Sequence, residues 1–215
     1  YSECPNEKCG HYNAHGLPAF APSRRGIHVR KAFSLLGKLS IQHCMGTVTY
    51  LGRGYSDALG GCMTLGDGIT VSNVIFEHCH AQDGGAVAIR YPSVVFENVS
   101  VSNSSAQGHG SAVAVNWGGS LIWIGGRVSN NWVQGDIAGH RWFGTVSGMG
   151  DGKIELYAVH FIHNYAASSW DGISIFTGNS APAGTNGTDL SIHPDFTGTV
   201  KVIDTNFTSP VFDPN

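Results

Sequence analysis

The chain has 215 residues and a formal net charge of −3, and only 13% of its residues are charged, about half the usual share. Glycine accounts for 30 residues, about twice its usual share, while 41% of the residues are hydrophobic, enough for a packed core rather than a disordered chain. No apolar run reaches the length of about 18 residues that indicates a membrane span, and no basic patch with interleaved aromatics supports nucleic-acid binding.

Residues 1–36 differ from the rest of the chain. They contain three prolines, the cysteines Cys4 and Cys9, and little alternation of polar and apolar residues. We expect an irregular N-terminal cap or arm, because the end of a stacked fold exposes strand edges and apolar surface that need cover. A disulfide between Cys4 and Cys9 would rigidify this segment.

A degenerate cassette recurs after residue 37, in which an apolar residue is followed three positions later by Cys, Asn or Ser. The copies are Ile41 with Cys44, Phe76 with Cys79, Val101 with Ser104, Val128 with Asn131, Phe161 with Asn164 and Ile203 with Asn206. A glycine turn followed by a short apolar strand lies between the early copies, as in Gly84-Gly85-Ala86-Val87. Irregular copies at this spacing are typical of stacked repeats.

The strands expected around the cassettes are short, and no helical apolar period separates them. They cover residues 70–76, 99–101, 121–124, 154–161 and 199–203. We therefore predict an all-β fold, a parallel β-helix or solenoid over residues 37–215. The main alternative is an antiparallel sandwich, which would need hairpin turns, and the one Asn-Gly pair, Asn186-Gly187, is not in a hairpin-like context.

Equivalent positions of successive coils stack along the axis of a parallel β-helix. Asn131, Asn164 and Asn206 are therefore expected to form a ladder of hydrogen-bonded side-chain amides at an interior corner. The same column continues through Cys44, Cys79 and Ser104. We interpret this column as structural rather than catalytic.

Cys44 and Cys79 would lie on neighbouring coils, with backbones about 5 Å apart, which is within disulfide range. We predict a disulfide between them, with Cys62 as a small buried apolar residue. The odd number of cysteines leaves one free thiol or an intermolecular bridge. The alternative is a zinc site that adds nearby imidazoles, from His43, His78 and His80. The disulfide is favoured because it needs only two residues and the spacing is not CxxC, so no metal or cofactor is expected.

Four Asn-x-Ser/Thr sequons begin at Asn98, Asn103, Asn186 and Asn206. Together with the cysteines they favour an extracellular or cell-surface glycoprotein that carries covalent N-glycans. Asn186 lies in a turn-rich stretch, and Asn98 is out of phase with the inward positions, so both should face solvent. Asn103 precedes a stacking position, and Asn206 occupies one.

An aromatic and polar insert follows the fourth cassette. Aromatic faces pack well on sugar rings, so the insert is a possible glycan-binding loop; the alternative is that its aromatics fold back over the coil. Its candidate residues are Trp132, Asp136, His140 and Trp142. A carbohydrate-cleaving enzyme would instead need clustered carboxylates. The residues that would have to converge in one groove are Asp83, Asp136 and Asp171, with Arg90 or Arg141.

Two segments carry a resemblance to a known family. Gly84-Gly85-Ala86-Val87 and Phe161-Ile162-His163-Asn164 resemble the Gly-Gly-Ala-Ile and Phe-x-x-Asn repeats of polymorphic outer-membrane-type adhesins. Over about residues 37–207 the chain resembles the pectin-lyase-like superfamily, which implies a single-stranded right-handed parallel β-helix. Gly108-His109-Gly110 also resembles a tripeptide of the galacturonases, but their paired-Asp and Arg-x-Lys motifs are absent, so no catalytic residues are expected.

These observations predict a non-enzymatic extracellular β-helix that serves as a glycosylated structural or adhesive module, such as a subunit of a surface filament or matrix. The expected partners are a homo-oligomer or end-to-end polymer of the chain and extracellular carbohydrate. The alternatives are a carbohydrate-active enzyme, either a polysaccharide lyase or a hydrolase, and a glycan-binding module.

Overall fold

The computed structural model of the chain describes residues 10–12, 18–20, 27–29, 33–44, 60–90, 92–116, 118–133, 144–166, 174–177, 188–192 and 196–208. Every helix or strand assigned in these ranges is a β-strand, which confirms the predicted all-β class. Accordingly, the described residues include no apolar helix of membrane-spanning length.

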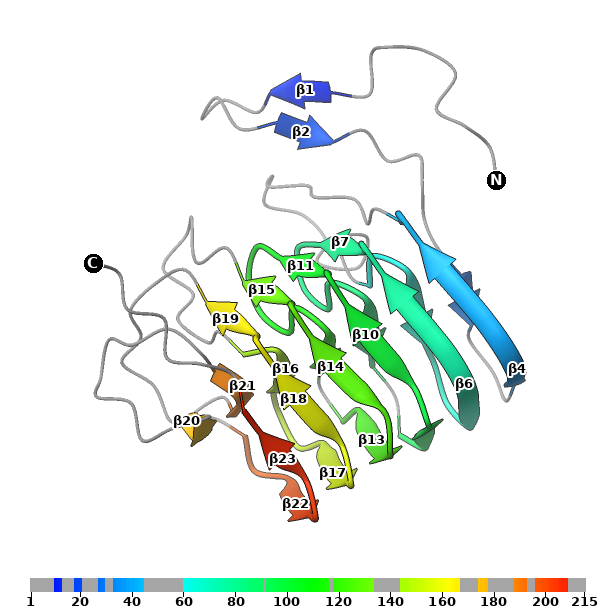
Figure 1. Cartoon of the computed structure of the whole chain (residues 1–215), viewed down its shortest axis with the longest axis vertical. Helices are drawn as coiled ribbons and strands as arrows, with labels where there is room; N and C mark the ends of the chain where they lie inside the picture. The colour runs from blue at the N-terminus through cyan, green and yellow to red at the C-terminus, as the bar shows by residue number, and fades with distance from the viewer. Residues whose placement is uncertain are drawn as a thin grey trace.

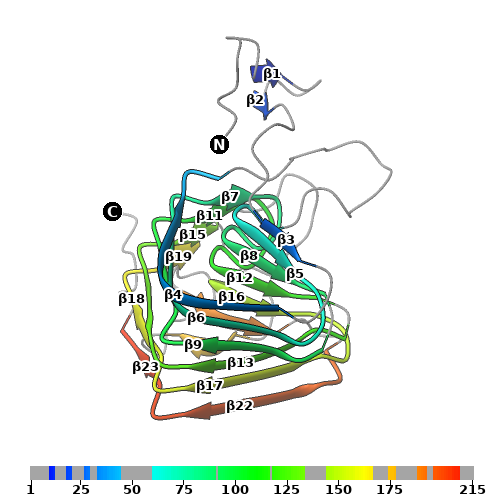
Figure 2. The same cartoon turned by 90° about the vertical axis from the view of Figure 1, so that its right-hand side faces the viewer.

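Three sheets lie around a common interior (Figures 1 and 2). The seven-stranded sheet contains, in spatial order, β20 (Ser174–Thr177), β21 (Thr188–Ile192), β16 (Val146–Gly148), β12 (Val113–Val115), β8 (Val87–Ile89), β5 (Met63–Leu65) and β3 (Ile27–Val29). The four-stranded sheet contains β19 (Tyr165–Ala166), β15 (Trp132–Val133), β11 (Ser105–Ala106) and β7 (His80–Ala81).

The ten-stranded sheet has two halves that meet at its longest strands, β4 (Phe33–Gln42) and β6 (Ile69–Glu77), which pair with each other. The first half continues from β6 through β9 (Val94–Glu97), β13 (Ser120–Ile124), β17 (Lys153–Tyr157) and β22 (Thr199–Ile203). The second half continues from β6 through β10 (Ser100–Ser102), β14 (Arg127–Ser129), β18 (His160–Ile162) and β23 (Asn206–Phe207). Separately, β1 (Gly10–Tyr12) pairs antiparallel with β2 (Pro18–Phe20).

The chain passes from the seven-stranded sheet through both halves of the ten-stranded sheet to the four-stranded sheet, and then starts again. We call each passage a coil: coil 1 holds β3 and β4, coil 2 holds β5 to β7, coil 3 holds β8 to β11, coil 4 holds β12 to β15, coil 5 holds β16 to β19, and coil 6 holds β21 to β23. The strands of neighbouring coils pair in parallel, and β20 pairs antiparallel with β21. The arrangement is compatible with a β-helix or solenoid and differs from the antiparallel sandwich.

Coil 1 begins earlier than the sequence pattern indicated. β3 pairs in parallel with β5, and β4 pairs with β6 from Phe33 onward. Residues that the sequence assigned to the cap at 1–36 therefore include strands of the two main sheets. Most of that segment, including Cys4 and Cys9, lies outside the described residues.

The cassette is confirmed as a column along the second half of the ten-stranded sheet. Its apolar residues are in register from one coil to the next, in the order Ile41, Phe76, Val101, Val128 and Phe161. The final copy was misassigned, because Phe207, not Ile203, pairs with Phe161, and their rings stack with centroids 4.9 Å apart. Ile203 pairs with Tyr157 on the exterior of the neighbouring half-sheet.

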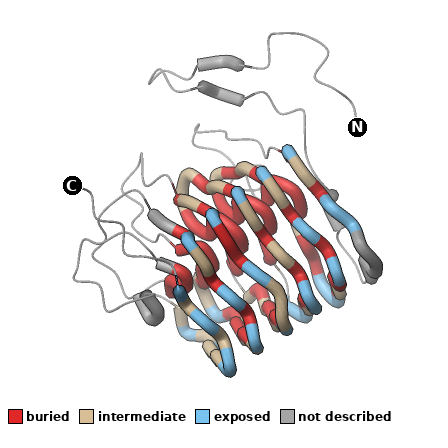
Figure 3. Tube along the Cα trace, in the orientation of Figure 1, coloured by how far each residue is buried: buried red, intermediate tan, exposed pale blue. Residues whose placement is uncertain are grey.

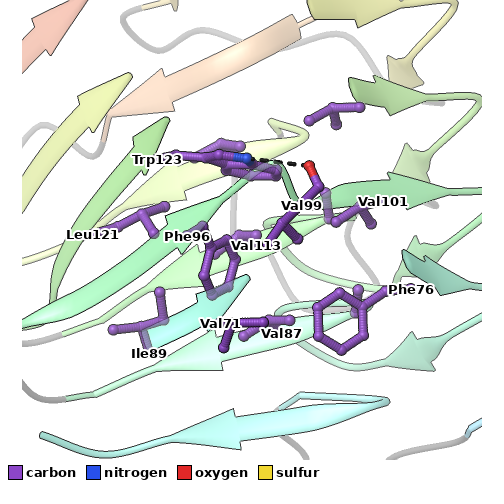
Figure 4. Packing of buried hydrophobic residues seen from close by; sticks show 14 of the residues in the cluster. Val71, Phe76, Val87, Ile89, Phe96, Val99, Val101, Val113, Leu121 and Trp123 are labelled. Carbon is purple, nitrogen blue, oxygen red and sulfur yellow. Dashed lines mark hydrogen bonds between the residues drawn. The ribbon is translucent and has the colours of Figure 1, made fainter. Parts of the chain in front are cut away.

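A second interior column follows the first half of the ten-stranded sheet, with Val71, Phe96 and Trp123 in register on successive coils (Figure 4). The ring of Phe96 meets that of Trp123 edge-on, with centroids 5.2 Å apart, and Trp123 Nε1 donates a hydrogen bond to Val99 O at 3.3 Å. Burial alternates along most of these strands, so that apolar residues face the interior and mostly polar ones face solvent (Figure 3).

The glycine-rich element forms a tight corner between the four-stranded and seven-stranded sheets. Gly84 and Gly110 have φ angles of 65° and 66°, a left-handed conformation that disfavours side chains. A Cβ atom on either residue would also collide with a backbone carbonyl, that of Val87 or Val113 respectively. The glycines are therefore required by both conformation and space.

The predicted amide ladder is present between Asn131 and Asn164, both fully buried. Asn206 does not join it, because it lies in register with His160 and is exposed. Its place is taken by Asp189 of β21, whose Oδ1 accepts a hydrogen bond from Asn164 Nδ2 at 3.0 Å. The ladder thus leaves its column at coil 6 and ends on a different sheet.

Candidate functional site

The corner after the four-stranded sheet brings together a carboxylate and an imidazole from successive coils. Asp83 follows β7, and His109 follows β11 one coil later. Asp83 Oδ1 lies 3.3 Å from His109 Nε2, and it accepts a hydrogen bond from the backbone N–H of His109, also at 3.3 Å. Both side chains are almost fully buried, with 4% and 8% of their surfaces exposed. This pair is the strongest chemical feature of the corner.

Gly108 makes room for the pair. A Cβ atom at this position would collide with Asp83 Oδ1. Each residue of the Gly-His-Gly tripeptide therefore has a structural role. Gly108 leaves space for the Asp83 carboxylate, and His109 contacts that carboxylate. Gly110 adopts the left-handed conformation of the turn.

A polar row lies on the four-stranded sheet next to this corner. His80, Ser105 and Trp132 occupy equivalent positions on β7, β11 and β15, and all three are half-buried. His80 Nδ1 and Ser105 Oγ share a hydrogen bond of 2.7 Å. Burial lowers the pKa of the His80 imidazole, and a backbone hydrogen bond with Ser105 opposes that shift. His80 is therefore held neutral over a wider pH range than an exposed histidine.

The insert of residues 134–143 begins and ends at the same corner. Val133 pairs with Ala106 on β11, and Gly144 O accepts a hydrogen bond from Ser111 N at 3.2 Å. Of the predicted glycan-binding residues, Trp132 is thus placed on the polar row beside the corner. Asp136, His140 and Trp142 lie outside the described residues.

Of the residues that would form the acidic groove of a carbohydrate-cleaving enzyme, only Asp83 and Arg90 lie in the described ranges. Asp83 pairs with His109, while Arg90 follows β8 and its backbone N–H donates to Leu65 O at 3.4 Å in the seven-stranded sheet. Asp136, Arg141 and Asp171 lie outside the described residues. Within the described ranges, no three His, Cys, Asp or Glu side chains are grouped to hold a metal ion.

The predicted disulfide partner was wrong. Cys79 is bonded to Cys62, with Cα atoms 5.5 Å apart, and Cys44 is a buried free thiol. Cys44 and Cys79 do occupy equivalent positions on neighbouring coils, as expected from the register at Ile41 and Phe76. Cys62, however, directly precedes β5, and Cys79 lies between β6 and β7 of the same coil, so the bond joins two different positions of the repeat. The repeat predicts which residues of successive coils stack on one another. It gives no information about contacts between different positions of one coil.

The mixed His–Cys zinc site is not formed, because alternate residues point to opposite sides of the chain. The rings of His43 and His78 stack outside the coil, with centroids 4.8 Å apart and planes 3° from parallel. Cys44 and Cys79 point into the core. Each histidine has a φ angle near 53°, at the turn that begins the corner.

Three of the four sequon asparagines lie on the surface. Asn98, Asn103 and Asn206 are exposed, and Asn186 lies outside the described residues. Asn98 Nδ2 donates a hydrogen bond to Asn73 Oδ1 at 2.9 Å, one coil away. An outward position leaves space for a glycan at each of the three described sites.

The sequence pattern did not identify the Asp83–His109 contact. The available signal was their separation of 26 residues, close to one coil, with a glycine immediately before the histidine. Comparisons of the chain with protein-family models, with curated proteins and with solved structures found no match.

Proposed function

We propose that this chain is a single-stranded right-handed parallel β-helix that acts outside the cell as a non-enzymatic structural or adhesive scaffold. The right hand is the expected one, because parallel crossover connections are right-handed in about 98% of cases. The Cys62–Cys79 disulfide is compatible with an oxidising location. N-glycans on the exposed asparagines Asn98, Asn103 and Asn206 would decorate its sides.

One observation carries the scaffold proposal: the unbroken column from Ile41 to Phe207. Each coil adds an apolar residue in register with the last, and the side chains from Ile41 to Phe161 are nearly or fully buried. A stack of this kind resists bending, because each coil is held to its neighbour by parallel strand pairs and by side-chain packing. Its exterior is then free to carry glycans and contact partners.

The geometry of Asp83 favours a structural rather than a catalytic role. A catalytic carboxylate must reach a substrate, but Asp83 is buried and its Oδ1 already contacts both His109 Nε2 and the His109 backbone N–H. We interpret the pair as a clamp between coils 2 and 3.

The scaffold proposal is tested by adhesion of beads coated with the secreted protein to the cell surface or matrix of its source. We expect adhesion that Asp83→Asn leaves unchanged. Wild-type protein that does not adhere, and that releases new reducing ends or unsaturated products from a polysaccharide panel in a reaction abolished by Asp83→Asn or His109→Asn, would contradict it.

Glycan binding at the corner is the second candidate function, favoured by the position of Trp132. Trp132 is half-buried and in register with Ser105 on the four-stranded sheet, next to the corner that holds the Asp83–His109 pair, and an aromatic face beside polar groups suits a sugar ring. Glycan-array signals that are lost in Trp132→Ala, but kept in the distant exposed variant Ile124→Ala, would support it. Equal signals in both variants would exclude Trp132 from binding.

A further inference from the structure

The Cys62–Cys79 disulfide lies at the boundary between coils 1 and 2, close to the segment that carries the free thiol of Cys44. Cys62 Sγ and Cys79 Sγ are bonded, and they lie 3.8 and 4.0 Å from the same backbone oxygen, Ile41 O. Ile41 belongs to coil 1, three residues before the free thiol of Cys44. The disulfide therefore lies against the coil that holds the unpaired cysteine.

Cys44 and Cys79 repeat the same geometry one coil apart. Each Sγ lies 3.5 Å from the carbonyl oxygen two residues earlier, Gln42 O for Cys44 and Glu77 O for Cys79. Those two preceding residues are register partners, and His80 N donates to Cys44 O at 2.9 Å. Paired backbones in a sheet are about 4.8 Å apart, so the two sulfurs are separated by about one strand spacing. That backbone spacing is within the range that a disulfide spans.

We infer that Cys79 can exchange its disulfide partner from Cys62 to Cys44 by thiol–disulfide exchange inside the core. The thiolate of Cys44 attacks Cys79 Sγ, a Cys44–Cys79 bond forms and the Cys62–Cys79 bond breaks. The electron pair leaves with Cys62 Sγ, which takes up the proton that Cys44 lost. The number of disulfides and thiols is unchanged, so no oxidant or reductant is required.

The exchange would change what the disulfide holds together. Cys62 and Cys79 are 17 residues apart within coil 2, so the observed bond does not cross-link coil 1 to coil 2. A bond from Cys44 would tie coil 1 to coil 2. The exchange therefore converts coil 1 from a coil without a disulfide to coil 2 into one that is cross-linked to it.

Burial controls how readily the exchange occurs. It raises the pKa of the Cys44 thiol, which lowers the thiolate fraction at neutral pH. The exchange should therefore be slow at neutral pH and accelerate by roughly tenfold per pH unit until the thiol is ionised.

The test follows the position of the free thiol in the full-length protein, with Cys4→Ser and Cys9→Ser in the background so that no other thiol can take part. The protein is incubated at pH 7 and at pH 9, denatured in acid, alkylated and mapped by mass spectrometry without reduction. We expect alkylation to begin at Cys44 and to spread to Cys62 at pH 9, with a constant total of one free thiol. Alkylation that stays on Cys44 at both pH values would overturn the inference.

Two variants separate exchange from simple reduction. In Cys44→Ser, Cys62 should remain protected at pH 9, and its alkylation there would show reduction instead of exchange. In Cys62→Ser, a Cys44–Cys79 bond should form, and amide hydrogen exchange in β4 should slow relative to wild type. Two free thiols in an oxidised Cys62→Ser protein that retains its β-sheet circular dichroism would count against the inference.

Discussion

Asn131 and Asn164 are locked together through one acceptor atom in the interior. Asn164 Oδ1 accepts hydrogen bonds from both the side-chain Nδ2 and the backbone N–H of Asn131, each at 3.0 Å. Asn164 Nδ2 in turn donates to Val128 O and to Asp189 Oδ1, each at 3.0 Å. These contacts join coils 4, 5 and 6, and both asparagines are fully buried.

Substitution of Asn164 by alanine should lower the free energy of unfolding substantially. Asn164→Ala removes the four buried hydrogen bonds just described, and each loss that leaves a buried group unsatisfied costs about 1–3 kcal/mol, so we expect a loss of roughly 3–5 kcal/mol. Urea unfolding followed by circular dichroism measures it. The control is Asn130→Gly, an exposed residue with a φ angle of 56°, which should change the free energy of unfolding by less than about 1 kcal/mol. Equal effects of the two substitutions would show that the ladder adds no stability.

Substitutions at Gly110 and Gly125 distinguish the cost of a left-handed backbone conformation from the cost of a steric clash. Both have a φ angle of 66°, but a Cβ atom on Gly110 would collide with Val113, whereas nothing lies within 4 Å of one on Gly125. Gly125→Ala should therefore cost only the left-handed conformation, about 1–2 kcal/mol. Gly110→Ala adds a steric clash and should cost at least about 3 kcal/mol, or prevent folding. Thermal unfolding of the two variants measures the difference, and a similar melting temperature for both would contradict the geometry of the corner.

His80 should make the fold sensitive to acid. Its folded-state pKa is lowered from 6.5 mainly by burial, so the unfolded chain binds the proton more readily. The stabilising effect of neutral His80 is thus present above pH 6.5 and is lost as the pH falls through the folded-state value. Urea unfolding of wild type and His80→Gln between pH 4.5 and pH 8 isolates this group from the other histidines. We expect the wild type to lose more stability than the variant in acid, and parallel pH profiles would contradict this.

The Asp83–His109 clamp should matter for stability rather than for adhesion. Asp83→Asn disrupts a buried contact between the carboxylate of Asp83 and both the imidazole and the backbone N–H of His109, and should destabilise the chain by about 1–3 kcal/mol. Asp67→Asn alters an exposed carboxylate and should have an effect of less than about 0.5 kcal/mol. Calorimetry gives the two values, and bead adhesion should be equal for both variants below their melting temperatures. A loss of adhesion in folded Asp83→Asn would instead place this corner in the binding site.

The sequence predicted the parts of the fold that repeat along the axis. The column from Ile41 to Phe161 and the glycine corner could be read because the same requirement recurs in each coil. Ile203 and Asn206 were misassigned because an apolar residue three positions before an asparagine also occurs where the chain turns from β22 to β23.

Two contacts could not be predicted from the spacing of the repeat. The Cys62–Cys79 bond joins the residue before β5 to a residue between β6 and β7, and these two positions are not equivalent within the repeat. The Asp83–His109 pair follows the repeat, but it depends on a single additional residue, Gly108, that shifts the histidine next to the carboxylate. Neither contact could be predicted from the sequence pattern alone.

The central claim is that equivalent side chains of successive coils stack in one parallel register. Nuclear Overhauser effects between valine methyl groups in a selectively labelled sample test it most directly. We predict cross-peaks between Val101 and Val128 in one column, and from Val87 through Val113 to Val146 in another. The absence of these contacts in the folded protein, or backbone contacts that show antiparallel neighbours, would contradict the claim.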